Sequence, residues 1–348
     1  MSHLFTRPYA AATIADNAEN GVPSCANDWL LNKVLRSWKP DAIVTTDCGA
    51  IANLKGPPAN ASDYVHAAAM ALMGGTDVES GDTQFSLLNA AIAKGLATAA
   101  AVDAAARRTF KMMFEIGRFD PANATEWHRY GLESVNSTAS QHANFEAALQ
   151  GQVLLVNTGV LPIKRGARVA VVGPQGDSRA GMLSSYASYQ YCYGNQTIRT
   201  PQIYCISTIL EGIAHGNVGG ITTAAHGVDI NSNKTDGIRS ALDLCEAADV
   251  VVLALGIDKS VEREGTDRVD TALPGLQEQF ALQVLALDKP TALVLTNGGA
   301  LAIDRLVVRP AGQRAAYAIV EAFNPNVLGA RAIGAALFGV GNRWGKLP

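Results

Sequence analysis

Continuous apolar runs, separated by stretches with helical spacing, constrain the fold of this 348-residue chain more than any other feature. The clearest runs are VAVVGP at 169–174, VVVLALG at 250–256 and TALVLT at 291–296. A strand buried on both faces has this pattern, because helices cover both sides of a parallel sheet. Between them, residues 273–288 place apolar side chains at helical spacing. We therefore expect residues 167–348 to form an α/β sandwich domain with a mostly parallel sheet.

The first part of the chain alternates in the same way. An apolar, β-branched run at 42–46 is followed by a helical pattern at 64–73, which a glycine pair ends, and by a longer helical pattern at 98–117. We expect two to three βα units over residues 1–120. Residues 121–166 are expected to connect the two domains and to hold one helix and one strand.

Composition excludes several classes of function. The net charge of −3 gives no attraction to nucleic acid or anionic membranes. No apolar run approaches the roughly 20 residues of a membrane span, and residues 1–21 lack the apolar core of a secretory signal peptide. The histidines show no HExxH spacing and the cysteines no CxxC pair, so we expect no metal. The turn GPQGD lacks both phosphate-binding glycine motifs, so we expect no cofactor.

Cysteines and glycosylation motifs bear on the cellular compartment. Cys25 with Cys48, and Cys192 with Cys205, could pair in an oxidising compartment, or each could remain a free buried thiol. About two Asn-x-Ser/Thr motifs would arise by chance in such a sequence. The chain has more of these motifs, and the excess points to a secretory origin. The motifs begin at Asn60, Asn123, Asn136, Asn195 and Asn233.

Acidic residues follow two of the predicted strands. Asp47 comes directly after the run 42–46, and Glu262 and Glu264 follow the run 250–256. The carboxyl ends of strands are where α/β enzymes keep their chemistry, and a pair of carboxylates suits hydrolysis of a glycosidic bond. The alternatives are a turn aspartate and solvated loop glutamates.

Seven segments, in this order, resemble glycoside hydrolase family 3, and within it the β-xylosidase-like branch. They are NGVPSCANDWLLNKVLR at 20–36, TDCGAI at 46–51, GGTDVESG at 74–81, FEIGRFDP at 114–121, VAVVGPQGD at 169–177, EREGTDR at 262–268 with LPGLQ, and the tail LFGVGNRWGKLP at 337–348. The resemblance implies that residues 1–120 are the C-terminal part of a (β/α)₈ barrel, followed by the family's α/β sandwich domain.

The resemblance also implies an activity. Asp47 would be the nucleophile of a retaining β-glycosidase, and Glu264 the general acid/base, with Glu262 as the rival for that role. Asp77 is expected near the barrel mouth, where it would touch a sugar or tune the nucleophile; Glu262 is expected at the substrate as well. Tyr186 lies in an aromatic-rich segment that would either stack on a sugar or pack at the rim. The expected substrates are the non-reducing ends of xylo-oligosaccharides or related β-glycosides, in a secreted or secretory-pathway protein.

The sequence departs from the family pattern at its front, where about five further barrel strands would precede these residues. A barrel cannot close without them. We therefore expect impaired turnover by this chain alone, and self-association through the open barrel edge. A catalytically inactive carbohydrate-binding or partner protein derived from the same family is the alternative.

Overall fold

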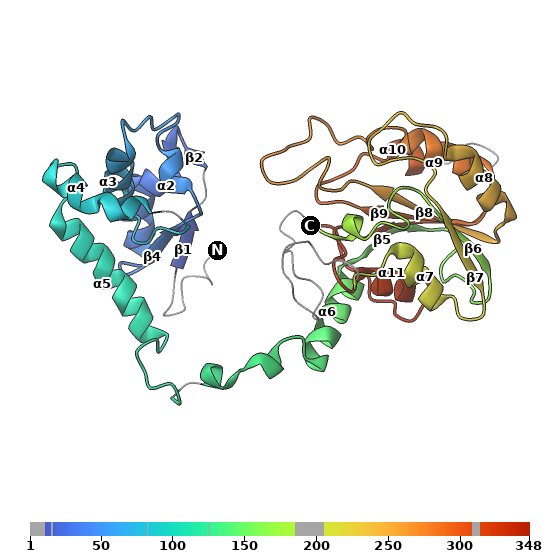
Figure 1. Cartoon of the computed structure of the whole chain (residues 1–348), viewed down its shortest axis with the longest axis horizontal. Coiled ribbons are helices and arrows are strands. Elements are labelled where there is room, and N and C mark those ends of the chain that lie inside the picture. Colours follow the sequence, from blue (N-terminus) through green and yellow to red (C-terminus); the bar gives the residue numbers. More distant parts are fainter. Residues whose placement is uncertain (1–10, 15–16, 82, 125, 185–204, 308–313) are drawn as a thin grey trace. The chain divides into compact units, whose positions relative to one another are not determined.

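The chain forms two compact units, Met1–Leu132 and Glu133–Pro348. The computed structural model describes residues 11–14, 17–81, 83–124, 126–184, 205–307 and 314–348 (Figure 1). Within these ranges no helix has the length and apolar character needed to cross a membrane.

Unit 1, residues 1–132, contains parallel strands of the kind expected for a barrel fragment. β1 (Ala11–Ile14) pairs in parallel with β4 (Ile43–Thr46), and a parallel bridge joins Thr45 to Val78 on the other side of β4. A short hairpin of β2 (Ala18–Glu19) and β3 (Val22–Pro23) lies between them in sequence. The strand expected at 42–46 is thus observed as β4, with its carboxyl end leading to Asp47.

Helices follow β3 and β4 in unit 1. α3 begins after Asp63, whose carboxylate accepts the His66 N–H, and ends at Gly75, where φ is +112°. α5 begins after Thr98, whose hydroxyl accepts the Ala101 N–H. The helices are η1 (Ser24–Ala26), the π-helix η2 (Trp29–Leu35), α1 (Arg36–Trp38), α2 (Ala50–Asn53), α3 (Tyr64–Gly74), η3 (Gln84–Leu87), α4 (Leu88–Ala93), α5 (Ala99–Glu115) and η4 (Glu126–Arg129).

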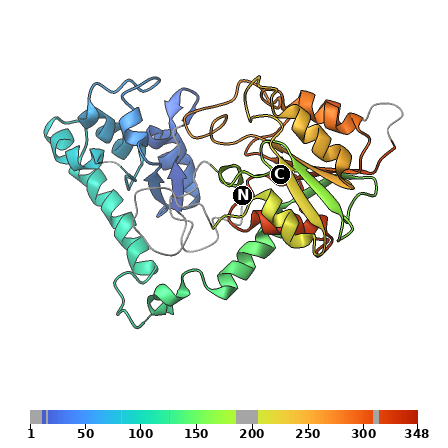
Figure 2. The same cartoon turned by 45° about the vertical axis from the view of Figure 1, so that its right-hand side comes forward.

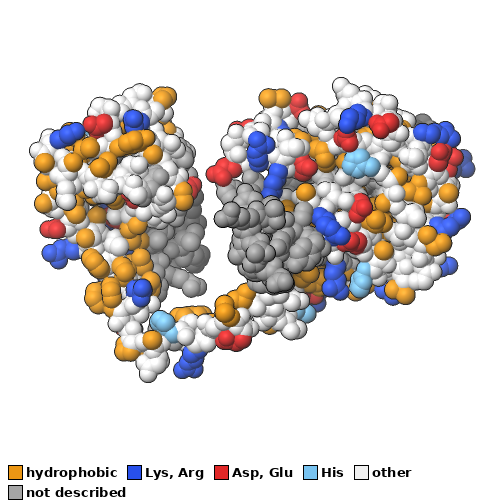
Figure 3. All heavy atoms as spheres, in the orientation of Figure 1, with side chains coloured by type: hydrophobic (Ala, Val, Ile, Leu, Met, Phe, Trp, Pro, Cys, Tyr) orange, Lys and Arg blue, Asp and Glu red, His pale blue; other side chains and the backbone are white. Residues whose placement is uncertain are grey.

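Hydrophobic side chains gather on the exposed surface of the C-terminal half of α5 (Figure 3). Phe110 and Phe114 are 52% and 65% exposed, and Phe119 just beyond the helix is 49% exposed. The ring centroids of Phe114 and Phe119 are 4.5 Å apart. Unit 1 therefore carries an apolar aromatic cluster that its own described residues leave open to solvent.

Unit 2, residues 133–348, is built on a six-stranded sheet with the order β5-β10-β9-β8-β6-β7. β5 pairs antiparallel to β10, whereas the other neighbours are parallel, with Val251 of β8 opposite Thr291 of β9. The mostly parallel sheet expected for the second half of the chain is thereby confirmed. The strands are β5 (Val153–Asn157), β6 (Arg168–Val172), β7 (Ile221–Ala225), β8 (Val250–Gly256), β9 (Thr291–Thr296) and β10 (Tyr317–Glu321).

Helices cover both faces of this sheet (Figure 2), so β9 is buried throughout and β8 is buried from Val251 to Gly256. One apolar cluster joins the sheet to α8 and α9, and the other joins its opposite face to α7 and α11. α6 belongs to unit 2, because Leu149 packs against Ala332 and Ala336 of α11. The helices are η5 (Leu132–Ser134), α6 (Thr138–Gly151), η6 (Ala180–Met182), α7 (Ile209–Gly216), α8 (Ile238–Ala247), α9 (Gln277–Ala286), α10 (Asp304–Val307) and α11 (Gly329–Leu337).

Candidate active site

Asp47 stands at the carboxyl end of β4 with its side chain exposed. One carboxylate oxygen, Oδ1, accepts the N–H of Cys48 at 2.7 Å, and α2 begins after Gly49. Gly49 has a φ of +81°, a conformation that glycine adopts without strain, so the chain can turn sharply from strand to helix here. This strand–turn–helix arrangement keeps the aspartate at the strand end and open to a ligand.

Asp77 lies beneath that strand end rather than at the surface, and its side chain is completely buried. Its Oδ2 accepts the Val44 N–H of β4 at 2.9 Å and pairs with Arg36 at 2.8 Å, while its Oδ1 pairs with Arg108 at 2.7 Å. Burial lowers the pKa of the Arg36 guanidinium, and the charge of Asp77 opposes that shift. Both carboxylate oxygens of Asp77 are thus engaged by protein groups that fix β4.

The loop after Asp77 is tied to the same strand. The Ser80 N–H donates to the hydroxyl of Thr46 at 3.0 Å, directly before Asp47. Glu79 accepts the N–H groups of Gln84 and Phe85 at 2.8 and 2.7 Å. These contacts show that Glu79 shapes the loop that follows.

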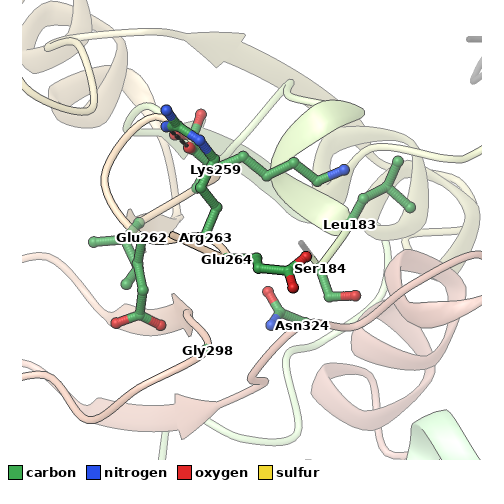
Figure 4. Close-up of a pocket in the computed structure, with 10 residues that line it drawn as sticks. Leu183, Ser184, Lys259, Glu262, Arg263, Glu264, Gly298 and Asn324 are labelled. Carbon is green, nitrogen blue, oxygen red and sulfur yellow. Dashed lines mark hydrogen bonds between the residues drawn. The ribbon is translucent and has the colours of Figure 1, made fainter. Parts of the chain in front are cut away.

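The second group of acidic residues lies in unit 2, in a cavity of about 340 Å³. Segments that follow β6, β8, β9 and β10 all contribute to it, so the cavity lies at the carboxyl edge of the sheet, where ligands bind in open α/β folds. Its lining residues are Leu183, Ser184, Ile257, Asp258, Lys259, Glu262, Arg263, Glu264, Gly298 and Asn324 (Figure 4).

The two glutamates of this cavity point in different directions. The carboxylate of Glu264 reaches between Ser184 and Asn324, whereas that of Glu262 turns toward Gly298 (Figure 4). Glu262 Oε2 accepts the Nε–H of Arg268 at 2.7 Å. The side chain of Glu262 is 30% exposed, and Arg268 occupies one of its oxygens. Glu264 is therefore the carboxylate that is directed into the cavity.

Two glutamine side chains, which sequence reasoning missed, fix the start of the loop that carries these glutamates. Gln277 accepts the Gly256 N–H at 2.9 Å and donates to the carbonyl oxygens of Gly256 and Ile230, each at 2.8 Å. Gln175 donates to the Ile257 carbonyl at 3.0 Å. Gln277 lies in LPGLQ and Gln175 in GPQGD, two of the segments on which the family resemblance rests. A sequence motif does not say which backbone groups its side chains will bind.

The remaining predicted residues have mixed outcomes. Cys25, which is buried, and Cys48, which is exposed, are not joined by a disulfide, so of the two alternatives for this pair the disulfide is wrong. Cys205 is disulfide-bonded, while its expected partner Cys192 lies outside the described residues, as does Tyr186. Over the described part of the chain, no group of His, Cys, Asp and Glu side chains is arranged to hold a metal ion.

An exposed aspartate at the end of a barrel-type strand, and a glutamate directed into a cavity at the carboxyl edge of an α/β sandwich, are features of a glycoside hydrolase. The model of the Glycosyl hydrolase family 3 C-terminal domain matches residues 152–348. The chain belongs to glycoside hydrolase family 3.

Similar proteins agree with this assignment. The chain is 35% identical to "Probable exo-1,4-beta-xylosidase bxlB" of Aspergillus terreus over 288 residues, which are 81% of this chain and 36% of that protein. It is 32% identical to the protein of the same name in Aspergillus flavus over 336 residues, 95% of this chain and 41% of that one. The chain thus spans about two fifths of the length of these curated relatives.

Solved structures show the same fold. A GH3 exo-β-xylosidase, XlnD, in complex with a xylobiose aziridine activity-based probe superposes with a TM-score of 0.82 at 26% identity, covering 95% of this chain and 41% of that one. A β-glucosidase from Listeria innocua in complex with isofagomine gives a TM-score of 0.77 at 24% identity, covering 94% of this chain and 43% of that one, and shows the fold alone.

Proposed function

We propose that this chain carries the two catalytic carboxylates of a retaining β-glycosidase that acts on the non-reducing ends of xylo-oligosaccharides or related β-glycosides. Asp47 is the nucleophile and Glu264 the general acid/base. The observation that carries the proposal is the exposed carboxylate of Asp47 at the carboxyl end of the parallel strand β4. The direction of Glu264 into its cavity supports it, as do relatives named exo-1,4-β-xylosidases.

The chemistry has two steps. The Asp47 carboxylate attacks the anomeric carbon, while protonated Glu264 gives its proton to the departing glycosidic oxygen. Glu264, now ionised, then takes a proton from water, whose oxygen displaces Asp47 from the sugar. No cofactor is needed, because the carboxylates supply both the nucleophile and the proton transfer.

Other predicted residues take supporting roles in this proposal. Asp77 acts by holding β4 through Val44, Arg36 and Arg108 rather than by touching the sugar. Glu262 lies beside the acid/base and contacts substrate with the oxygen that Arg268 leaves open. Tyr186, outside the described residues, keeps its proposed role as a sugar-stacking side chain.

We further propose that the 348-residue polypeptide by itself turns over substrate slowly. Within the described residues, unit 1 supplies three parallel segments, β1, β4 and the bridge at Val78, whereas a complete barrel has eight strands. Substrate positioning lowers the reaction barrier by about 7–11 kcal/mol in well-oriented reactions. A site in an incomplete barrel holds the substrate less firmly, so it lowers the barrier by less. The same observation favours a second candidate function, carbohydrate binding without turnover.

Two observations support a secretory-pathway location within this proposal. Cys205 is disulfide-bonded, which requires an oxidising compartment in most organisms. The asparagines of the described glycosylation motifs, Asn60, Asn123, Asn136 and Asn233, are all exposed.

The acid/base assignment is tested by replacing Glu264 with alanine. Hydrolysis of xylobiose, which has a poor leaving group, should fall by about 10²–10⁴-fold. Hydrolysis of dinitrophenyl β-xyloside should fall far less, and azide should accelerate it with formation of β-xylosyl azide. Glu262→Ala is the matched control and should show no azide acceleration. If azide accelerates Glu262→Ala and not Glu264→Ala, the acid/base is Glu262. If the wild type and both variants bind xylobiose without hydrolysing it, the carbohydrate-binding function is favoured.

A further inference from the structure

A buried carboxylate lies at the end of β10, close to the cavity that holds Glu262 and Glu264. Glu321 is the last residue of β10, and only 6% of its surface is exposed. The four residues before it, YAIV, are wholly buried. An acidic side chain in such a place is costly unless hydrogen bonds compensate it, so the partners of Glu321 indicate what it does.

The carboxylate of Glu321 joins two loops. Its Oε1 accepts the Phe323 N–H at 2.8 Å, and its Oε2 accepts the side-chain amide of Asn297 at 3.3 Å. The same Asn297 amide donates to the Gly299 carbonyl at 3.0 Å, and the Asn297 backbone N–H donates to the Phe323 carbonyl at 3.1 Å. The loops that follow β9 and β10 are therefore held together around one carboxylate.

Both loops reach the cavity directly. Gly298 and Asn324 are among its lining residues. A Cβ atom placed on Gly298 would lie 2.8 Å from Glu262 Oε1 and 3.4 Å from the side-chain nitrogen of Asn324. The backbone of the first loop thus packs against Glu262, and Asn324 of the second loop faces Glu264 (Figure 4).

The backbone of the second loop is in a conformation that needs support. Phe323 has a φ of +52°, which is unfavourable for a bulky residue. Such a conformation costs about 1–3 kcal/mol and persists only where the surrounding contacts fix it. The hydrogen bond from the Phe323 N–H to Glu321 is one of those contacts.

We propose that Glu321 is a positioning residue of the glycosidase site: with Asn297, it holds the loops that place Gly298 and Asn324 against Glu262 and Glu264. This inference rests on the function proposed above. Burial raises the pKa of the Glu321 carboxyl, so the charged form has a desolvation cost here that its two hydrogen bonds have to offset. Strain and buried polar groups of this kind concentrate at functional sites.

Glu321→Gln separates positioning from folding. Glutamine fills the same volume and can still accept the Phe323 N–H with its oxygen, but its NH₂ group then faces the NH₂ group of Asn297. The hydrogen bond between residues 321 and 297 is lost, and the Asn297 amide keeps only the Gly299 carbonyl as its acceptor. Replacing a buried acid with a neutral side chain should leave the melting temperature of unit 2 equal or higher. Asn297→Ala breaks the same connection from the other side, and exposed Glu246 on α8 provides the matched control Glu246→Gln.

The experiment uses the chain itself. Hydrogen exchange should become faster in residues 297–300 and 322–326 in Glu321→Gln, and not in Glu246→Gln. The kcat/KM for xylobiose should fall about ten-fold more than that for dinitrophenyl β-xyloside, because a displaced acid matters most for a poor leaving group. Asn297→Ala should give the same pattern, and the double variant should be no worse than the poorer single variant.

Two results would overturn the proposal. One is unchanged exchange in both loops of Glu321→Gln. The other is an unchanged ratio between the two substrates, which would leave Glu321 with a structural role only. Absence of turnover in the wild type and in Glu246→Gln is a different result, because it rejects the proposed glycosidase function on which this inference rests.

Discussion

Replacing Asp77 with alanine should destabilise unit 1 by about 3–5 kcal/mol, the usual cost of removing one partner from a buried ion pair. The side chain of Asp77 is fully buried, and that of Arg36 is 9% exposed. The substitution leaves the Arg36 and Arg108 guanidinium groups without their counter-charge and the Val44 N–H without its acceptor. Since the stability of a whole domain is about 5–15 kcal/mol, a large share of the folding free energy of unit 1 would be lost.

Urea denaturation followed by tryptophan fluorescence can measure this loss. Trp29, Trp38 and Trp127 belong to unit 1, and Trp344 to unit 2. The matched control is Asp103→Asn, at an exposed position on α5, which should change stability by less than about 0.5 kcal/mol. An Asp77→Ala variant with the stability of this control would refute the reasoning, and Asp77 would then be free to serve the substrate directly.

Three further results are expected. Hydrogen bonds from Arg168 lower the pKa of exposed Asp249 from the usual 3.8 to about 2, so the stabilisation by this pair is complete above pH 4 and is lost as the pH falls toward 2; an NMR titration midpoint near 3.8 would contradict this. Gly256→Ala should destabilise unit 2 by about 3 kcal/mol or more, because φ is +146° and the new Cβ would lie 1.9 Å from a carbonyl oxygen of β9. At Gly166, φ is +84° and nothing lies within 4 Å of the new Cβ, so Gly166→Ala should destabilise the unit clearly less. Equal losses of stability would show that the close approach at Gly256 does not matter. Light scattering should show self-association that Phe114→Ser reduces, since Phe114 is 65% exposed; a monodisperse wild-type chain would argue against it.

The sequence predicted the sheet of unit 2 well, because its signal is local and strong. The run VVVLALG became β8 over the expected residues, Val250–Gly256, and the run at 42–46 became β4. Both strands are short and largely buried. β4 ends directly before Asp47, and β8 ends shortly before the segment that carries Glu262 and Glu264. The positions of Asp47 and of the Glu262–Glu264 segment at strand ends followed from this pattern.

The contacts of the site could not be predicted, because they join residues that are distant in sequence. Nothing near Asp77 indicates that Arg36 and Arg108 would bury it, and the strand pattern at 317–321 gives no partner for Glu321. The antiparallel pairing of β5 with β10 also depends on where the chain returns to the sheet. The directions of Glu262 and Glu264 depend on how their loop turns, and the pairing of Glu262 with Arg268, six residues later, is not evident from the sequence.

The most direct test of the central claim is to identify the residue that becomes attached to a sugar. A xylobiose-configured aziridine should esterify one carboxylate of the chain, and peptide mass spectrometry should locate the adduct on Asp47. Asp103→Asn should label like the wild type, whereas Asp47→Asn should not label. An adduct on another carboxylate, or labelling that survives Asp47→Asn, would contradict the assignment of Asp47 as the nucleophile.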